Sequence, residues 1–153
     1  MANKTKQVSF ENYLIKREST EAFLHYYCSK HYLRRLRTRR LRACTMYRIG
    51  LLSTQRFHSL LLKDLIQGMP QKRFERIAKE FAVSFLDPYV NMLHVNRVLQ
   101  LKSEGYIIEV QSKGMEEWVR PWCDKFGLLY VQASKACMDE NKRLTGEIVE
   151  PSL

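Results

Sequence analysis

Four consecutive residues, Gln111, Ser112, Lys113 and Gly114, follow an apolar stretch and mark the place where we expect a ligand. In open α/β sheets, ligands bind outside the carboxyl ends of the strands. The Lys113 ammonium group could meet a phosphate there, although a lysine at a turn is more often a solvated surface residue. The sequence therefore predicts that part of any binding site lies at these positions.

The elements that must position these residues are predicted by the run from Ile107 to Leu128. It begins as an apolar strand, turns at Lys113–Gly114, continues as an amphipathic helix and stops at Gly127. A second apolar strand, Leu128–Val131, comes next. A strand, a crossover helix and a strand within about thirty residues form the βαβ unit of a parallel sheet.

The middle of the chain has helical periodicity with short joints, which is typical of a small helical bundle. Ser19 or Thr20 is expected to cap the first helix, Ser53 or Thr54 the second, and Asp87–Pro88 to begin the last. The expected helices cover residues 21–29, 54–67, 70–85 and 87–103. Strands are expected near both ends, at 8–10 and in a hairpin of 135–138 and 143–149 with its turn at 139–141, so the predicted class is α/β.

Length and composition are those of one globular domain of 153 residues with a net charge of +10. There is no run of 18 apolar residues, so no membrane span is expected. The amino-terminal sequence MANKTKQ lacks the apolar core of a secretory signal, and we expect a cytoplasmic protein.

The positive charge is concentrated in the segment Lys30–Arg42, KHYLRRLRTRRLR. Such a run can bind nucleic acid or an anionic membrane surface. It can also be the solvated face of an amphipathic helix whose arginine stems cover apolar surface. The candidate contacts to an anionic partner are Arg34, Arg35, Arg37, Arg39, Arg40 and Arg42.

Other catalytic or metal-binding patterns are weak. The four cysteines, Cys28, Cys44, Cys123 and Cys137, form no CxxC pair and are expected to be free buried thiols. The four histidines have no partner at metal-ligand or triad spacing, and the sequence contains no glycine-rich phosphate loop. Trp118 and Trp122, four apart on one predicted helix, are best explained as core residues.

Several segments in combination resemble the phosphoserine phosphatase-like branch of the haloacid dehalogenase superfamily. YRIGLLS followed by LIQGMPQKRFERIAKEF is similar to its helical cap. LDPYVNMLHVNRVLQLKSEGYIIEVQS is similar to the approach to its second motif, and GMEEWVRPWCDKFGL with RLTGEIVEPS to the segments after that motif. The resemblance implies a Rossmannoid parallel sheet with an inserted helical cap. The core would comprise residues 1–15 and 90–153 and the cap residues 16–89. Because the likeness covers about the first two thirds of such a protein, we expect an incomplete core.

The resemblance also implies a chemistry, the Mg²⁺-dependent hydrolysis of the phosphate ester of a small molecule. In this family an Asp-x-Asp-Gly-Thr motif comes directly after the first strand, and its first aspartate attacks phosphorus. A serine or threonine after the next core strand, a lysine and an acidic pair hold the phosphoryl group and the metal.

The sequence departs from that pattern at each motif. The residues at Phe10–Ile15 are FENYLI, where Glu11 is the nearest replacement for the nucleophile. Gln111 stands at the serine or threonine position; Ser112 comes one residue later and would point to the opposite face of the strand. Lys113 is the nearest phosphate-binding cation. The lysine and acidic-pair motifs would lie beyond residue 153, so we expect this chain to bind no Mg²⁺.

Other acidic or polar positions have weaker assignments. Asn12 and Tyr13 are poor replacements for the general acid–base aspartate. Glu18 could contact substrate or only begin a helix, and Glu109 is out of pattern in a strand that should be buried.

Three hypotheses are compatible with these departures. The chain is a family member with degenerate motifs and little or no activity. Alternatively, it is an active hydrolase that uses Glu11, with missing groups supplied by another chain. The third hypothesis is that the chain is a non-catalytic module that binds an anionic partner through residues 30–42. An incomplete core would also expose apolar sheet surface and favour self-association.

Overall fold

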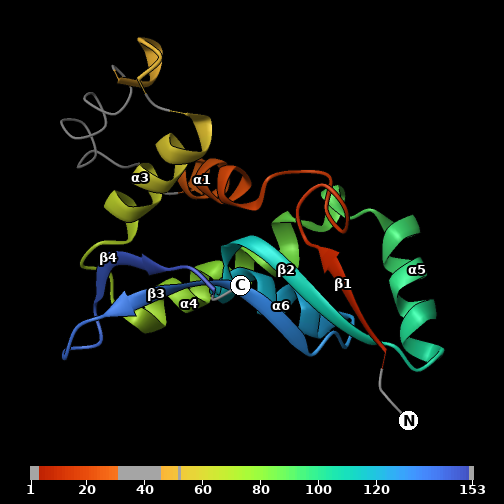
Figure 1. Cartoon of the computed structure of the whole chain (residues 1–153). Coiled ribbons are helices and arrows are strands. Elements are labelled where there is room, and N and C mark those ends of the chain that lie inside the picture. Colours follow the sequence, from red (N-terminus) through yellow and green to blue (C-terminus); the bar gives the residue numbers. More distant parts are fainter. Residues whose placement is uncertain (1–3, 31–45, 52, 152–153) are drawn as a thin grey trace.

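One mixed sheet of four strands organises the computed structural model, which describes residues 4–30, 46–51 and 53–151 (Figure 1). The strand order is β1 (Thr5–Ser9), β2 (Ile107–Met115), β3 (Tyr130–Met138) and β4 (Leu144–Val149). β1, β2 and β3 are parallel, whereas β4 is antiparallel to β3. The predicted α/β class, the βαβ unit and the carboxyl-terminal hairpin are confirmed.

The crossover between β2 and β3 is α6 (Glu116–Lys125), as predicted. The predicted turn at Lys113–Gly114 is wrong, because β2 continues through both residues and ends at Met115. The β2–β3 register shifts between Gln111 and Met115, so the strand is irregular where a turn was expected. β3 likewise begins at Tyr130 rather than Leu128.

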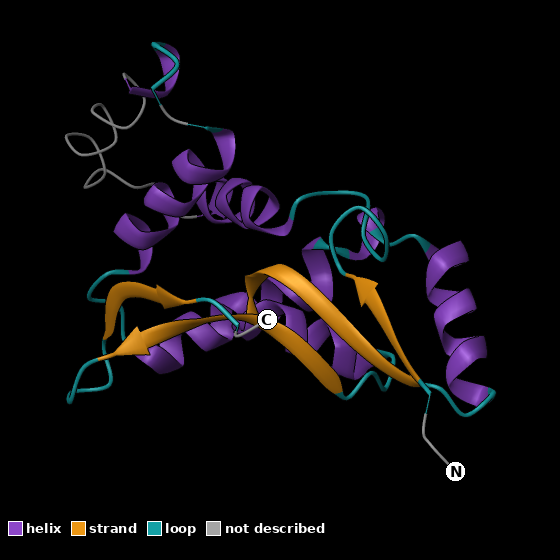
Figure 2. Ribbon diagram, in the orientation of Figure 1, coloured by secondary structure: helices purple, strands orange, loops and turns teal. Residues whose placement is uncertain are grey.

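The described helices between β1 and β2 are drawn in purple in Figure 2, and their bounds largely match the predicted ones. Their bounds are α1 (Ser19–Lys30), α3 (Thr54–Ile66), α4 (Gln71–Glu80), the π-helical segment η2 (Phe81–Phe85), the 3₁₀ turn η3 (Asp87–Tyr89) and α5 (Met92–Ser103). The Ser53 hydroxyl accepts a hydrogen bond from the Arg56 N–H at 3.3 Å, which confirms the predicted cap of α3.

Two predicted helix starts are wrong. At α1 the cap is Glu18, whose carboxylate accepts hydrogen bonds from the N–H groups of Thr20 and Glu21 at 3.3 and 2.7 Å. Asp87–Pro88 begins only the short turn η3, because Val90 has extended backbone with ψ of 130° and interrupts the helical path. α5 starts afterwards, at Met92.

The core is a cluster of aromatic rings shared by the sheet-covering helices. Trp118 of α6 is fully buried, and Phe23 of α1 stacks on it with ring centroids 4.7 Å apart. Phe74 of α4 and Phe81 of η2 meet Phe23 edge to face at 6.0 and 5.2 Å. Burial of such rings stabilises a fold by several kcal/mol, roughly 1.5–3 for each side chain. α1 and α4, from the predicted cap, thus share one core with α6; the division into cap and core domains remains a prediction.

Glu109 was not expected in a buried strand, and its presence is explained by the sheet face that lies opposite the core. Its carboxylate accepts hydrogen bonds from the side-chain amides of Gln7 at 3.0 Å and Gln132 at 2.6 Å. Ile108 and Val110, its neighbours along β2, are buried on the other face, as alternation requires. The expected apolar second face is therefore polar at these positions. The exposed apolar sheet residues lie at strand ends, at Tyr130, Met138 and Val149.

Three further sequence predictions concern membrane spans, the arginine-rich segment and the cysteines. None of the helices in the described ranges is long and apolar enough to cross a membrane. The arginines of the 30–42 segment lie outside the described residues. Cys123 is buried, but Cys28 and Cys137 are only half-buried, so the expectation of buried thiols is wrong for those two residues; Cys44 lies outside the described residues.

Candidate functional site

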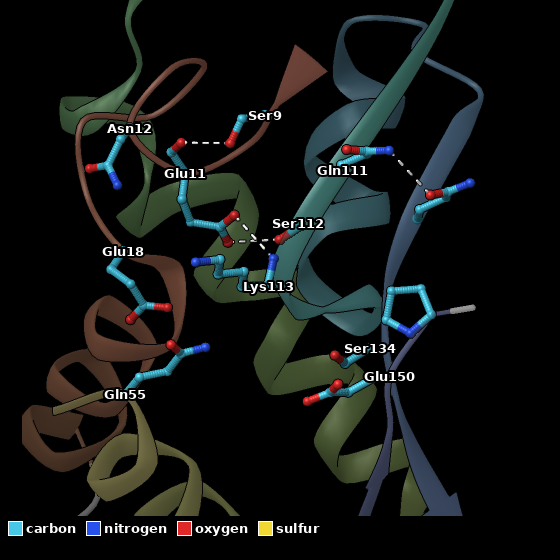
Figure 3. A pocket seen from close by; sticks show the side chains of 12 residues that line it. Ser9, Glu11, Asn12, Glu18, Gln55, Gln111, Ser112, Lys113, Ser134 and Glu150 are labelled. Carbon is cyan, nitrogen blue, oxygen red and sulfur yellow. Dashed lines mark hydrogen bonds between the residues drawn. The ribbon is translucent and has the colours of Figure 1, made fainter. Parts of the chain in front are cut away.

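A cavity of about 510 Å³ lies at the carboxyl ends of β1 and β2, beside Gln132 and Ser134 of β3 (Figure 3). This is the edge of the sheet at which ligands bind in open α/β folds. Its lining carries three carboxylates, Glu11, Glu18 and Glu150, and the Lys113 ammonium group. The other lining residues are mostly polar: Ser9, Asn12, Gln55, Gln111, Ser112, Gln132, Ser134 and Pro151.

The loop after β1 is anchored so that Glu11 is held at the base of this cavity. Phe10, Leu14 and Ile15 are fully buried, and the Phe10 N–H donates to the Gln111 carbonyl at 2.8 Å. The chain turns at Asn12, whose φ of 59° lies in the left-handed region that asparagine tolerates better than most residues. Glu11 is only 7% exposed.

The Glu11 carboxylate accepts three hydrogen bonds. The hydroxyls of Ser19 and Ser112 both donate to Oε1, at 2.6 and 2.7 Å, and the Lys113 backbone N–H donates to Oε2 at 3.2 Å. The two hydroxyl bonds have the short length of O–H···O⁻ bonds to an ionised carboxylate. Glu11 thus joins the loop after β1 to α1 and to β2.

Ser19 is the site residue that the sequence interpretation missed. It is fully buried, and its hydroxyl also accepts a hydrogen bond from the indole N–H of Trp118 at 3.2 Å. Its sequence context marked it only as a helix cap, because the irregular loop between Glu11 and Ser19 has no regular spacing and Trp118 is 99 positions away. Only the packing of α1 on α6 reveals its role.

A glycine is required at position 114 because neighbouring side chains approach its Cα closely, and not because of its backbone angles. A Cβ at this position would collide with the Ser19 hydroxyl and lie 2.8 Å from the Trp118 indole nitrogen and 3.2 Å from Glu11 Oε1. The Gly114 N–H in turn donates to the Ser112 hydroxyl at 3.0 Å. A residue without a side chain at 114 lets Glu11, Ser19, Ser112 and Trp118 converge.

The three predicted phosphate contacts all line the same cavity, but their side chains point in different directions. Gln111 lies on the polar face of the sheet, where its amide donates to Gln132 at 3.4 Å. Ser112 points to the opposite face of β2 from Gln111, as alternation predicts, and its hydroxyl meets the Glu11 carboxylate on that face. The Lys113 side chain is exposed and lines the cavity (Figure 3).

Among the described residues, the Glu11 carboxylate is largely occupied and is a poor ligand for a Mg²⁺ ion. Magnesium takes oxygen ligands in near-octahedral geometry at about 2.0–2.1 Å and commonly uses one or two carboxylates with free lone pairs. Here both oxygens of Glu11 already accept hydrogen bonds from Ser19, Ser112 and Lys113. In the described part of the chain, no group of three or more histidine, cysteine or acidic residues is arranged to hold a metal.

The sequence model of the haloacid dehalogenase-like hydrolase family matches residues 14–153. The chain therefore belongs to the haloacid dehalogenase superfamily of hydrolases. The resemblance drawn from its motifs is confirmed. No match is found among curated proteins.

Solved structures show the same fold at low sequence identity. A protein of unknown function from Bordetella pertussis Tohama I superposes with a TM-score of 0.78 at 14% identity, over 97% of this chain and 67% of that one. A phosphoserine phosphohydrolase-like protein from Francisella tularensis subsp. tularensis SCHU S4 gives 0.59 at 21% identity, over 95% and 64%. A phospho-aspartyl intermediate analogue of phosphoserine phosphatase gives 0.53 at 17% identity, over 97% and 64%. The chain spans about two thirds of these proteins and has a phosphoserine phosphatase-like fold.

Proposed function

We propose that this chain is a phosphoserine phosphatase-like hydrolase of the haloacid dehalogenase superfamily that hydrolyses small phosphomonoesters weakly or not at all. The observation that supports this is the position of Glu11, whose buried carboxylate is held by Ser19, Ser112 and the Lys113 N–H. A carboxylate engaged in this way contributes to the structure of the loop and is poorly placed for chemistry.

Three steps of the family reaction lack a suitable group. A nucleophile must approach phosphorus to about 3–3.5 Å with an aligned lone pair, whereas Glu11 would first have to break its hydrogen bonds. Asn12, the next residue, cannot act as a general acid or base. The described residues provide no carboxylate set for Mg²⁺, which in this family shields the repulsion between carboxylate and phosphate.

The experiment is the hydrolysis of 4-nitrophenyl phosphate, with Mg²⁺ and with a chelator, by the wild type and by Glu11→Ala. We expect no Mg²⁺-dependent turnover by the wild type above that of the variant. Rapid metal-dependent turnover that disappears in a Glu11→Ala variant shown to be folded by circular dichroism would identify Glu11 as a working nucleophile and would refute the proposal.

A second function rests on the sequence alone. The six arginines between residues 34 and 42 favour a module that binds an anionic partner such as nucleic acid. Phosphate contacts weaken steeply with salt because bound counterions are released. Binding of a short RNA that weakens with salt and is lost when the six arginines become glutamine would support this function. Salt-insensitive or absent binding would exclude it.

A further inference from the structure

We infer that the Glu11 carboxylate occupies a subsite for small anions, so that the chain carries its own internal ligand there. Removing that carboxylate should open the subsite to a free carboxylate or to inorganic phosphate. The inference deepens the proposed function, on which it rests, because an occupied anion subsite is one reason for weak phosphoester hydrolysis.

The groups around Glu11 are those that recognise an oxyanion. Two hydroxyls, from Ser19 and Ser112, and one backbone N–H, from Lys113, converge on the two carboxylate oxygens at 2.6, 2.7 and 3.2 Å. They come from two elements, α1 and β2, that are far apart in the sequence. All three are donors, and donors directed at one point are the usual basis of anion binding in proteins.

The donors are fixed in place independently of Glu11. Ser19 is oriented by the Trp118 indole N–H at 3.2 Å, and Ser112 by the Gly114 N–H at 3.0 Å. Because each hydroxyl oxygen already accepts one of these bonds, its proton is directed elsewhere, toward the carboxylate. The arrangement should therefore persist when the Glu11 side chain is truncated.

A free anion could also reach the subsite. Glu11, Ser112 and Lys113 all line the cavity of about 510 Å³, which opens at the carboxyl ends of β1 and β2 (Figure 3). The exposed Lys113 contributes a positive charge to the lining, which also carries the carboxylates of Glu18 and Glu150. The wild type cannot bind a second anion at the same point without displacing Glu11.

The test is thermal unfolding of the wild type, Glu11→Ala and Glu11→Gln against increasing formate or phosphate, with chloride at equal ionic strength as the reference. Glu11→Ala empties the subsite, whereas Glu11→Gln keeps it filled with a neutral group of the same shape. A ligand that binds only the folded state raises the Tm by mass action, and near saturation we expect a rise of about 2–4 °C in Glu11→Ala alone. Adding Ser112→Ala to Glu11→Ala should abolish the rise.

Three results would overturn the inference. One is no saturable shift of Glu11→Ala with either anion. Another is an equal shift in the wild type or in Glu11→Gln, and the third is a shift that persists in the Glu11→Ala, Ser112→Ala double variant. If Glu11→Ala does not fold in chloride, its refolding is monitored in formate and in phosphate by near-UV circular dichroism. Recovery with either anion supports the inference and no recovery with both overturns it. Hydrolysis by the wild type tests the proposed function separately.

Discussion

The Glu11 carboxylate and the Ser112 hydroxyl lie 2.7 Å apart although 101 positions separate them in the sequence. Their hydrogen bond joins the loop after β1 to the carboxyl end of β2, the two places that bear the first two motifs in related hydrolases. Both side chains are buried and Glu11 accepts two further hydrogen bonds, which supports our proposal that the contact serves the fold.

Replacing Ser19 with alanine should destabilise the protein. The change removes a charge-assisted bond to Glu11 and leaves the Trp118 indole N–H without its acceptor. Loss of a buried hydrogen bond to a charged group typically costs about 1.5–3 kcal/mol. Urea unfolding should show a decrease of this size, whereas the exposed Ser103→Ala should change stability by less than about 0.5 kcal/mol. Equal stability of the two variants would contradict the structural role of Ser19.

Gly114→Ala should be destabilising by about 1–3 kcal/mol, because the new methyl group overpacks the Ser19 hydroxyl and the Trp118 ring. The clash with Ser19 predicts a specific non-additivity. Once Ser19→Ala has removed the hydroxyl, Gly114→Ala should cost less than it does alone. Thermal unfolding of both single variants and the double variant measures this, and strict additivity would show that Gly114 is not limited by Ser19.

Glu117 should make stability depend on pH. Burial raises the pKa of its carboxyl above 4.5, and Oε2 has no hydrogen-bond partner in the described residues, although the Ala136 N–H bonds to Oε1. Above pH 4.5 the unfolded chain releases this proton while the folded chain still binds it, so this group's contribution to the free energy of unfolding falls as pH rises toward the higher folded value. Glu117→Gln should remove that decrease, whereas the exposed Glu140→Gln should not. Parallel pH profiles for the wild type and Glu117→Gln would contradict this prediction.

The cysteines should differ in reactivity. Burial raises the pKa of the Cys123 thiol to about 12, and the nearby Asp124 carboxylate adds to the shift. Because the thiolate is the reactive form, Cys123 should resist alkylation by iodoacetamide at pH 8 until the protein unfolds. The half-buried Cys28 and Cys137 should react first. Mass spectrometry after a time course locates the label, and early labelling of Cys123 would show that its region opens.

Local signals in the sequence were sufficient for much of the fold. Apolar spacing and the Ser53 cap predicted α3, and the turn at Asp139–Asn141 predicted the β3–β4 hairpin. Gly114 misled the prediction because a glycine required by close approach has the same sequence appearance as one required by a turn. Glu109 looked anomalous because its partners, Gln7 and Gln132, lie on neighbouring strands.

The candidate site could be predicted only in part from the sequence, because its contacts join residues on different elements. Glu11 and Ser112 were found through the family motifs, but their direct contact depends on how the loop after β1 turns at Asn12. Ser19 could not be identified at all, since its place beside Glu11 depends on the packing of Phe23 and Trp118 between α1 and α6. The contacts of Glu11 with Ser112 and of Ser19 with Trp118 span about a hundred positions and have no local pattern in the sequence.

The most direct test of the central claim is a double-mutant cycle of Glu11→Gln and Ser112→Ala, measured as the free energy of unfolding in urea. If Glu11 is a structural acceptor, each change should destabilise the protein, and the two effects should be coupled by about 0.5–3 kcal/mol. A Glu11→Gln variant as stable as the wild type, with no coupling to Ser112, would contradict the account. It would show that the Glu11 carboxylate is retained for something other than holding the fold.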